Sequence, residues 1–337
     1  MNAVIRGLSV LLALCLLPST GTPQQAHLVP TIGILTTLPC AEGALQARDP
    51  LWQALQDRGY EQGRSVRIEC RSAAAGESNR LPELARELVG RKVDVLVTQG
   101  TQAALAAKQA TSSIPIVIAL VADAVATGLV TSLARPGGNV TGLSVFGPQI
   151  VPKQLDLLKE IAPWITRVAI LTDLSNPGLV AELSLQDVIA RRLQLEVQRV
   201  DVRSPADLDA ALASVLGGRA DAMLMAPLPI RRDDARRIMQ FAERNRLPTI
   251  GTVSEMYVET GVLLFYTFSL QEHYQRLAHA VDRILKGARP ADLPVEQPTR
   301  FEVVLNAGTA KALDIKAPDS LILRVDRVID ERSRASN

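Results

Sequence analysis

From Pro30 onward, short runs of β-branched residues alternate with longer amphipathic stretches. This alternation limits the fold more than any other feature of the sequence, because it is typical of βαβ units that build a parallel sheet. The first series predicts strands at residues 31–36, 65–70, 94–98, 114–120 and 140–145, with helices at 49–58, 81–89 and 102–110. One wound sheet is expected from this half of the chain.

A second series with the same alternation follows. It predicts strands at 167–172, 195–200, 222–226, 249–251 and 261–266, and helices at 154–161, 179–192, 207–216, 233–244 and 271–286. A chain of 337 residues is long enough for two domains, each with its own core. The predicted fold class is therefore α/β, with two doubly wound parallel-sheet lobes.

The C-terminal part breaks the pattern. It predicts a Pro-rich extended connector at 287–298, a strand at 300–306, a short helix at 307–313 and a last strand at 321–329. This tail is too short for a third domain, so we expect it to cross back between the lobes and form a multi-segment hinge. The expected division is 28–146 plus 267–298 for lobe 1, and 147–266 plus 299–330 for lobe 2.

The N-terminal residues 1–26 have the order of a secretory signal peptide. One cation, Arg6, precedes an apolar run at 8–17 that is too short to span a bilayer, and a small, polar stretch follows. The alternative is a buried N-terminal helix. A lipoprotein signal with Cys15 as the lipid-modified cysteine is a weaker prediction, because Leu14 stands where the lipobox motif has a small residue. We therefore expect export to the periplasm.

Two cysteines, Cys40 and Cys70, would remain after removal of the leader. Each follows a predicted strand, and those strands should be neighbours. An oxidising compartment allows a disulfide between them, and two separate half-buried thiols are the alternative. Neither cysteine has a partner at metal-ligand spacing, so no metal is expected.

Composition and motifs argue against several functions. The 37 basic residues nearly balance the 35 acidic ones without a concentrated basic stretch, so nucleic acid is a poor candidate partner. No GxGxxG follows the first strand, no GxxxxGK[ST] is present, and Gly142 to Phe146 lacks the last glycine of a nucleophile elbow. The histidines His273 and His279 fall on different faces of one predicted helix. We expect neither a cofactor nor catalysis.

In open parallel sheets, ligands bind beyond the carboxyl ends of the strands. The loops expected there contain the candidate ligand-binding residues Thr36, Thr37, Gly100, Thr101, Gln102, Asp123, Ser175, Asn176, Pro227 and Thr252. Thr101 begins a helix and could help to hold a ligand carboxylate, or could only cap that helix. Asp123 could accept a ligand ammonium group, or could only cap a helix that starts near Val125.

Aromatic residues are few, at 3% of the chain. Tyr266, a further candidate ligand-binding residue, and Phe146, Tyr257 and Phe265 could line a cleft by stacking on a ligand ring. They could equally belong to the core.

Several long segments, 55–69, 94–130, 128–144, 284–306 and 310–315, resemble bacterial ABC transporter substrate-binding proteins of the type that includes tryptophan-binding members. The resemblance covers nearly the whole mature chain. It implies a type I periplasmic binding protein fold, with two flavodoxin-like lobes, three crossovers and closure on a small ligand. It also implies an amino-acid ligand, often aromatic, and an ABC transporter permease as partner.

The sequence has Ala122-Asp123-Ala124 where this family commonly shows Gly-Asp-Pro. The acidic position is retained, while its neighbours differ. Recognition of a carboxylate by Thr101 and of an ammonium group by Asp123 is the resulting hypothesis.

Other functions remain open at this stage. An α/β enzyme could use the same cleft, but would need a titrating base or metal near the strand ends. The ligand-sensing half of a transcriptional regulator would need an N-terminal helix-turn-helix, where the leader stands. An exported sensor that does not transport is a further alternative. We expect a monomer.

Overall fold

The computed structural model describes residues 29–37, 40, 49–73, 76–145, 150–180, 183–251 and 260–330. The expected signal peptide at 1–26 lies outside these residues.

The first sheet has six strands in the order β11-β5-β4-β3-β1-β2, and every neighbouring pair is parallel. The strands are β1 Thr31–Thr36, β2 Arg67–Ser72, β3 Val95–Gln99, β4 Ile116–Val121, β5 Val140–Ser144 and β11 Val295–Glu296. All residues of β3 are buried, as expected for a parallel strand with helices on both faces.

Four helices cover this sheet: α1 Pro50–Gln56, α2 Leu81–Gly90, α3 Thr101–Ala110 and α10 Leu270–Leu285. One core lies beneath α2 and α3, and a separate core lies beneath α1 and α10. Helix α1 begins where the Asp49 side chain accepts a hydrogen bond from the Trp52 amide at 2.9 Å.

The second sheet has seven strands in the order β13-β12-β10-β9-β8-β6-β7. They are β6 Arg167–Thr172, β7 Glu196–Asp201, β8 Ala222–Met225, β9 Thr249–Gly251, β10 Leu264–Phe268, β12 Phe301–Asn306 and β13 Arg327–Ile329. The pair β10 and β12 is antiparallel, and the other pairs are parallel. Strands β12 and β13 thus run opposite to the other five, and oppositely directed strands toward one edge of a parallel sheet are common.

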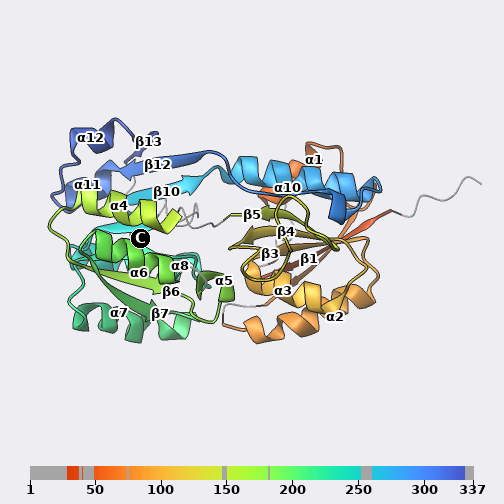
Figure 1. Cartoon of the computed structure of the whole chain (residues 1–337), viewed down its shortest axis with the longest axis horizontal. Helices are drawn as coiled ribbons and strands as arrows, with labels where there is room; N and C mark the ends of the chain where they lie inside the picture. The colour runs from red at the N-terminus through yellow and green to blue at the C-terminus, as the bar shows by residue number, and fades with distance from the viewer. Residues whose placement is uncertain are drawn as a thin grey trace, which may run out of the picture.

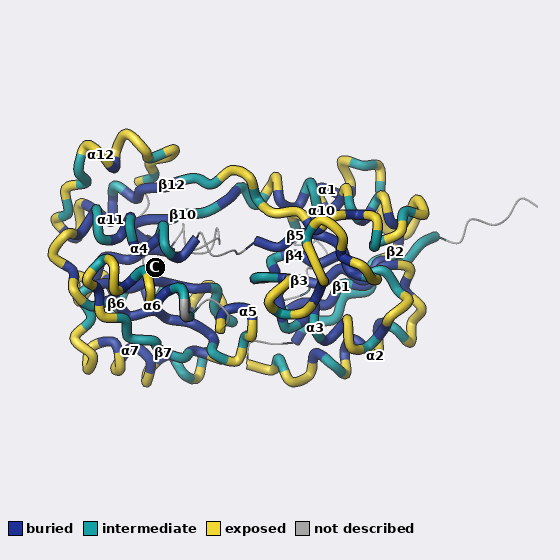
Figure 2. Tube along the Cα trace, viewed as in Figure 1, coloured by how far each residue is buried: buried dark blue, intermediate teal, exposed yellow. Residues whose placement is uncertain are grey.

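Helices cover both faces of the second sheet as well. One core lies beneath α4 Ile150–Ile161, α6 Leu183–Arg192, α11 Ala307–Ala312 and α12 Asp319–Ile322. The other lies beneath α7 Leu208–Gly217 and α8 Arg232–Arg244, and the short helix α5 Pro177–Val180 stands at the end of β6. Buried residues follow the strands of both lobes in Figure 2.

The two lobes lie side by side along the long axis of the molecule (Figure 1). Within the described residues the chain passes between them three times: from β5 to α4, from β10 to α10, and from β11 to β12. At these passages Val145, Ile150 and Phe268 form a small buried cluster with Ala122. The structure confirms the predicted fold class of two wound α/β lobes joined by a multi-segment hinge.

The C-terminal part differs from its prediction in two places. The connector at 287–298 is not wholly extended, since it contains a turn of 3₁₀ helix at Pro290–Asp292 and the strand β11. The strand predicted at 321–329 is wrong before residue 327, since residues 321 and 322 end α12 and residues 323–326 connect this helix to β13. Pro318 precedes this helix as its N-cap, and Leu321 is fully buried in the core beneath α4.

No described helix combines the length and the apolar character that crossing a membrane requires.

Candidate functional site

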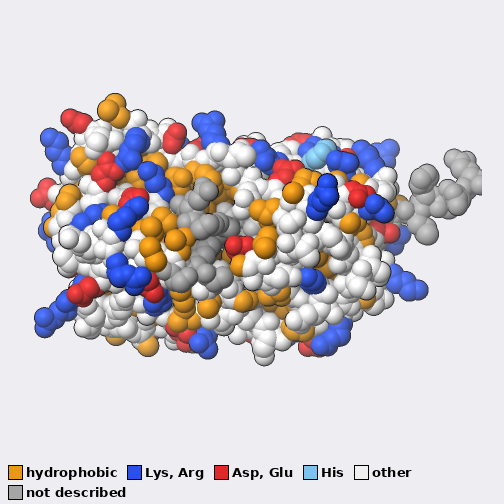
Figure 3. Space-filling view, in the orientation of Figure 1, with side chains coloured by type: hydrophobic (Ala, Val, Ile, Leu, Met, Phe, Trp, Pro, Cys, Tyr) orange, Lys and Arg blue, Asp and Glu red, His pale blue; other side chains and the backbone are white. Residues whose placement is uncertain are grey.

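The carboxyl ends of the parallel strands in each sheet face the other lobe (Figure 1). The loops that follow these ends therefore border the space between the lobes. On the face shown in Figure 3, hydrophobic side chains gather where the lobes meet, while charges of both signs are spread over each lobe.

At the end of β1, the Thr36 hydroxyl donates a hydrogen bond of 2.9 Å to Gln99 Oε1 at the end of β3. The Gln99 amide lies 3.5 Å from the Tyr274 hydroxyl on α10. Both Thr36 and Gln99 are buried, and Thr37, the residue after Thr36, is half-buried. Gln99 was not predicted as a ligand-binding residue, although the parallel register places it directly opposite Thr36.

The turn from β3 into α3 depends on Gly100, whose φ of 93° lies in the region that favours glycine. Thr101 is the first helical residue, with Gly100 as the N-cap. The Thr101 hydroxyl does not cap the helix, because it accepts a hydrogen bond of 3.1 Å from the Ala122 amide. The first amides of α3 have no partner within the helix, which is the usual basis of anion binding at such a position.

Asp123 follows β4 and is half-buried. Its Oδ1 accepts hydrogen bonds from the amides of Val125 and Ala126, at 3.0 and 2.9 Å. The helix predicted to start near Val125 is wrong, since residues 124–128 form a turn, and Asp123 stabilises this turn instead. Its Oδ2 has no hydrogen-bond partner among the described residues, so a second role at this oxygen is chemically available.

In the second lobe, the loop after β6 is held by its own side chains. Asp173 is buried, and its Oδ1 accepts hydrogen bonds from the Ser175 amide at 2.9 Å and the Ser175 hydroxyl at 2.5 Å. Asn176 Oδ1 accepts a hydrogen bond from the Gly178 amide at 3.0 Å. The polar side chains of this loop therefore fix its shape.

The two lobes meet at these loops. Gln102 Nε2 donates to Ser175 Oγ at 3.2 Å and lies 3.5 Å from Asp173 Oδ2. The structure thus brings the predicted residues Gln102 and Ser175 together from opposite lobes. Asp173 was not predicted as a ligand-binding residue, although it directly follows the buried strand β6, as the loop with Ser175 does.

The structure does not bring the remaining predicted residues to the contact between Gln102 and Ser175. Pro227 follows β8 and is half-buried. Tyr266 lies on β10 near the hinge, where its ring stacks on Phe301 at a centroid distance of 5.3 Å, and burial raises the pKa of its phenol. Phe265 is 1% exposed and belongs to the core of the second lobe. Thr252, Tyr257 and Phe146 lie outside the described residues.

A cavity in the first lobe adjoins the ends of β1, β2 and β3. It is lined by Thr36, Gln99, Asp49, Trp52 and the disulfide between Cys40 and Cys70, together with four aliphatic residues. The disulfide is one of the two arrangements that the sequence left open. The cavity measures about 40 Å³, and Thr36, Gln99 and Trp52 are buried, so it has room for water and not for an amino acid.

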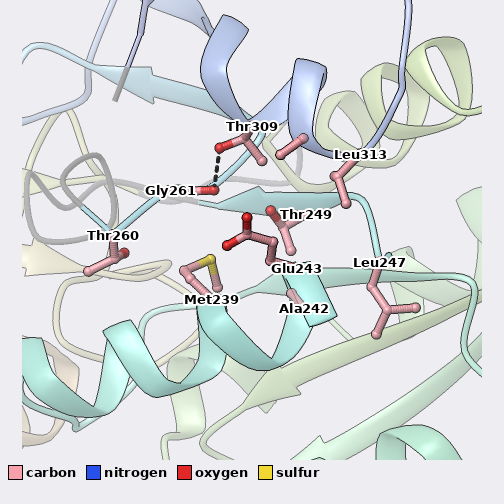
Figure 4. Close-up of a pocket in the computed structure, with 10 residues that line it drawn as sticks. Met239, Ala242, Glu243, Leu247, Thr249, Thr260, Gly261, Thr309 and Leu313 are labelled. Atoms are coloured by element: carbon pink, nitrogen blue, oxygen red, sulfur yellow. Dashed lines mark hydrogen bonds between the residues drawn. The ribbon is translucent and has the colours of Figure 1, made fainter. Parts of the chain in front are cut away.

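A different cavity lies at the amino-terminal ends of β9 and β10, away from the loops described above. Met239, Leu247, Thr249 and Leu313 are among its lining residues, and the Thr309 hydroxyl closes one side by donating to the Gly261 carbonyl at 2.8 Å (Figure 4). It is small and largely apolar. It contributes nothing to a site between the lobes.

The described residues contain no group of three or more His, Cys, Asp and Glu side chains that could hold a metal ion. His273 is buried at the start of α10 between Phe268 and Tyr274, and burial lowers the pKa of its imidazole to about 4. This side chain lies at the hinge and not at the strand ends.

Comparison with known proteins gives a consistent result. The model of a family described as ABC transporter substrate binding protein matches residues 32–329. A protein described as tyrosine-binding protein, from Clostridioides difficile strain R20291, is 26% identical over 280 residues, covering 80% of this chain and 77% of that protein.

Two solved structures cover 89% of this chain and 99% of their own. The structure of an ABC domain in complex with L-Trp from Streptococcus pneumonia is 24% identical, with a TM-score of 0.78. The ligand-free, open structure of a substrate binding protein with adhesive properties from Clostridium difficile is 25% identical, with a TM-score of 0.61.

Proposed function

Because this chain belongs to the family of ABC transporter substrate-binding proteins, we propose that it captures a free aromatic amino acid, tyrosine or tryptophan, between its lobes. The meeting of Gln102 with Ser175 across the lobes carries this proposal. A ligand that lies between these loops can contact both lobes at once, and it then stabilises the closed arrangement over the open one.

The chemistry of the loops fits the two charged groups of an amino acid. The ligand carboxylate would bind the first amides of α3, next to Gly100 and Thr101, where the helix dipole favours an anion. Its ammonium group would bind Asp123, whose Oδ2 has no partner among the described residues. Asp173 is the second candidate for the ammonium group, because its Oδ2 makes only a long contact to Gln102.

The remaining predicted site residues complete this proposal. Thr36, Thr37, Asn176, Pro227, Thr252 and Tyr266 would form the walls around the ligand side chain. The names of the relatives support an aromatic side chain. The lobe division at 28–146 plus 267–298 and 147–266 plus 299–330 is proposed with it, since α10 and β11 join the first sheet and β12 the second.

The wider role follows from the family. We propose that the chain is exported to the periplasm by its leader, acts as a monomer, delivers its ligand to an ABC transporter permease and catalyses no reaction. The alternative of an enzyme in the same cleft lacks support from the loops, because Asp123 and Asp173 accept hydrogen bonds within their own loops and the other polar side chains are hydroxyls and amides.

Calorimetric titration of the mature chain with single amino acids tests the ligand. Saturable binding of L-tyrosine or L-tryptophan, with far weaker binding of L-lysine and L-glutamate, is expected. Asp123→Asn should weaken binding by about tenfold to a hundredfold, because it removes the negative charge that would pair with the ligand ammonium group. Thr101→Val should also weaken binding, because valine cannot accept the hydrogen bond from the Ala122 amide that holds the start of α3 in place.

The control for these variants is Asp233→Asn, at a carboxylate on α8 whose side chain is 87% exposed. It should bind as the unmodified chain does. Unchanged affinity in both cleft variants would refute the assigned residues, and no binding of any amino acid would refute the ligand class.

A further inference from the structure

Between α3 and α5 the two lobes meet at a small set of residues, which we call the closure seam. It consists of Thr101, Gln102 and Ala122 in the first lobe, and of Ser175 and Gly178 in the second. Within the seam, Gly178 on the short helix α5 faces Thr101 and Ala122.

Gly178 leaves no room for a side chain. A Cβ at this position would lie 2.5 Å from the Ala122 Cβ and 2.8 Å from the Thr101 Oγ1, both of them on the opposite lobe. Such distances are well inside van der Waals contact. The lobes therefore reach this arrangement only because residue 178 is glycine.

Neither side of the seam can yield without breaking hydrogen bonds. The Gly178 amide donates to Asn176 Oδ1, and the next two amides both donate to the Asn176 carbonyl. Opposite them, the Thr101 hydroxyl is held by the Ala122 amide, and both residues are 2% exposed. A clash here would be relieved by moving the lobes apart.

The backbone of Gly178 does not itself require glycine. Its φ lies outside the left-handed region, in contrast to Gly76, whose φ is 87° and whose Cβ would lie 2.7 Å from the Ser204 Cβ of the other lobe. Substitution of Gly76 would strain the local backbone as well as this separate contact between the lobes. Substitution of Gly178 perturbs the seam alone, and alanine is intrinsically preferred to glycine within a helix.

We propose that Gly178 is the positioning residue that sets how closely the lobes approach, and thereby the affinity for the ligand between them. The inference rests on the proposed function, since it concerns the closed form of the same cleft. Any side chain at this position holds the lobes apart and lowers the population of the closed form. The observed affinity falls by the same factor as that population.

The test compares three variants. Gly178→Ala should bind L-tyrosine and L-tryptophan about tenfold or more weakly by calorimetry, while its thermal unfolding without ligand stays at or above that of the unmodified chain. Gly217→Ala is the matched control, because this glycine ends α7 in the same lobe and a Cβ there meets nothing within 4 Å. The double variant Gly178→Ala with Ala122→Gly removes the shortest contact and should recover part of the lost affinity.

A measurement without ligand separates this inference from the proposed ligand. Gln102→Cys with Ser175→Cys places one thiol on each side of the seam, and a short bifunctional thiol reagent then traps closures as they occur. Adding Gly178→Ala should slow this trapping about tenfold, whereas adding Gly217→Ala should not.

Equal trapping rates with and without Gly178→Ala would overturn the role of Gly178, whatever the ligand is. The same applies if Gly217→Ala slows trapping as much. Slower trapping in a chain that binds neither amino acid would instead uphold Gly178 and refute only the proposed ligand.

Discussion

Acidification should destabilise this protein through His273 before its carboxylates are protonated. The imidazole is 2% exposed, and neither ring nitrogen has a hydrogen-bond partner among the described residues. Burial, with a smaller contribution from the charge of Arg276, lowers its pKa from about 6.5 to about 4. The folded protein therefore keeps this histidine neutral at a pH where the unfolded chain has already bound a proton.

The sign and size of the change in stability follow from this difference in pKa between the folded and the unfolded chain. Between pH 6.5 and pH 4 the unfolded chain binds the extra proton, so the free energy of unfolding falls as the pH falls. The contribution is fully present above about pH 6.5 and is lost by about pH 4. The fall in pKa corresponds to about 3 kcal/mol, since each pKa unit is worth about 1.4 kcal/mol.

The charged groups around His273 are few. Glu272 and Arg276 lie on the same helix, and Arg300 reaches the same small cavity from the passage between β11 and β12. Arg276 already pairs with Glu272 and with Glu296. A protonated His273 would thus enter a buried site beside a cation whose own partners are occupied.

The substitution His273→Leu isolates the effect. It replaces two buried nitrogens that lack partners by an apolar side chain of similar size, so stability at pH 7 should be equal or higher. Urea unfolding, followed by circular dichroism at several pH values from 7 to 4, should show about 3 kcal/mol less acid destabilisation than in the unmodified chain. His279→Gln, at an exposed position of the same helix, is the control for the loss of a histidine side chain. Parallel stability curves for His273→Leu and the unmodified chain would refute the reasoning.

Two further predictions concern stability. Reduction of the disulfide between Cys40 and Cys70, which are 30 residues apart, should lower the free energy of unfolding by about 3 to 4 kcal/mol, as measured by urea unfolding. A Cys40→Ala, Cys70→Ala variant should be insensitive to reductant. Equal stability of the oxidised and reduced forms would contradict this prediction. Gly142→Ala should lower the free energy of unfolding by more than about 3 kcal/mol. The reason is that φ at Gly142 is 123° and that a Cβ would lie 2.3 Å from the Ile118 carbonyl oxygen in the neighbouring strand. Gly138→Ala, where a Cβ has open space, is its control, and similar unfolding of both variants would show that the close approach in β5 is not as described.

The sequence carried most of the fold because the signals are local. Strands β6 and β9 were predicted to the residue, since each is a short buried run bounded by polar residues or turns. The segment 321–329 was mistaken because its aliphatic residues suit either a strand or a helix, and packing of Leu321 beneath α4 decides between them. Tertiary contact outweighs local preference there.

The candidate site was only partly accessible from the sequence. The rule that ligands bind beyond strand ends located Gln102 and Ser175, which the structure brings together across the lobes. The same rule did not reveal Gly178, because its importance lies in a contact with Thr101, 77 positions earlier in the chain. Nor could it reveal that the Thr101 hydroxyl binds the Ala122 amide instead of capping its helix.

Small-angle X-ray scattering of the mature chain, titrated with L-tyrosine and L-tryptophan, tests most directly whether the lobes close on a ligand. The account predicts a saturable decrease in the radius of gyration that follows the binding isotherm and leaves the amino acid chemically unchanged. Binding with an unchanged radius of gyration, or conversion of the amino acid to a product, would contradict it.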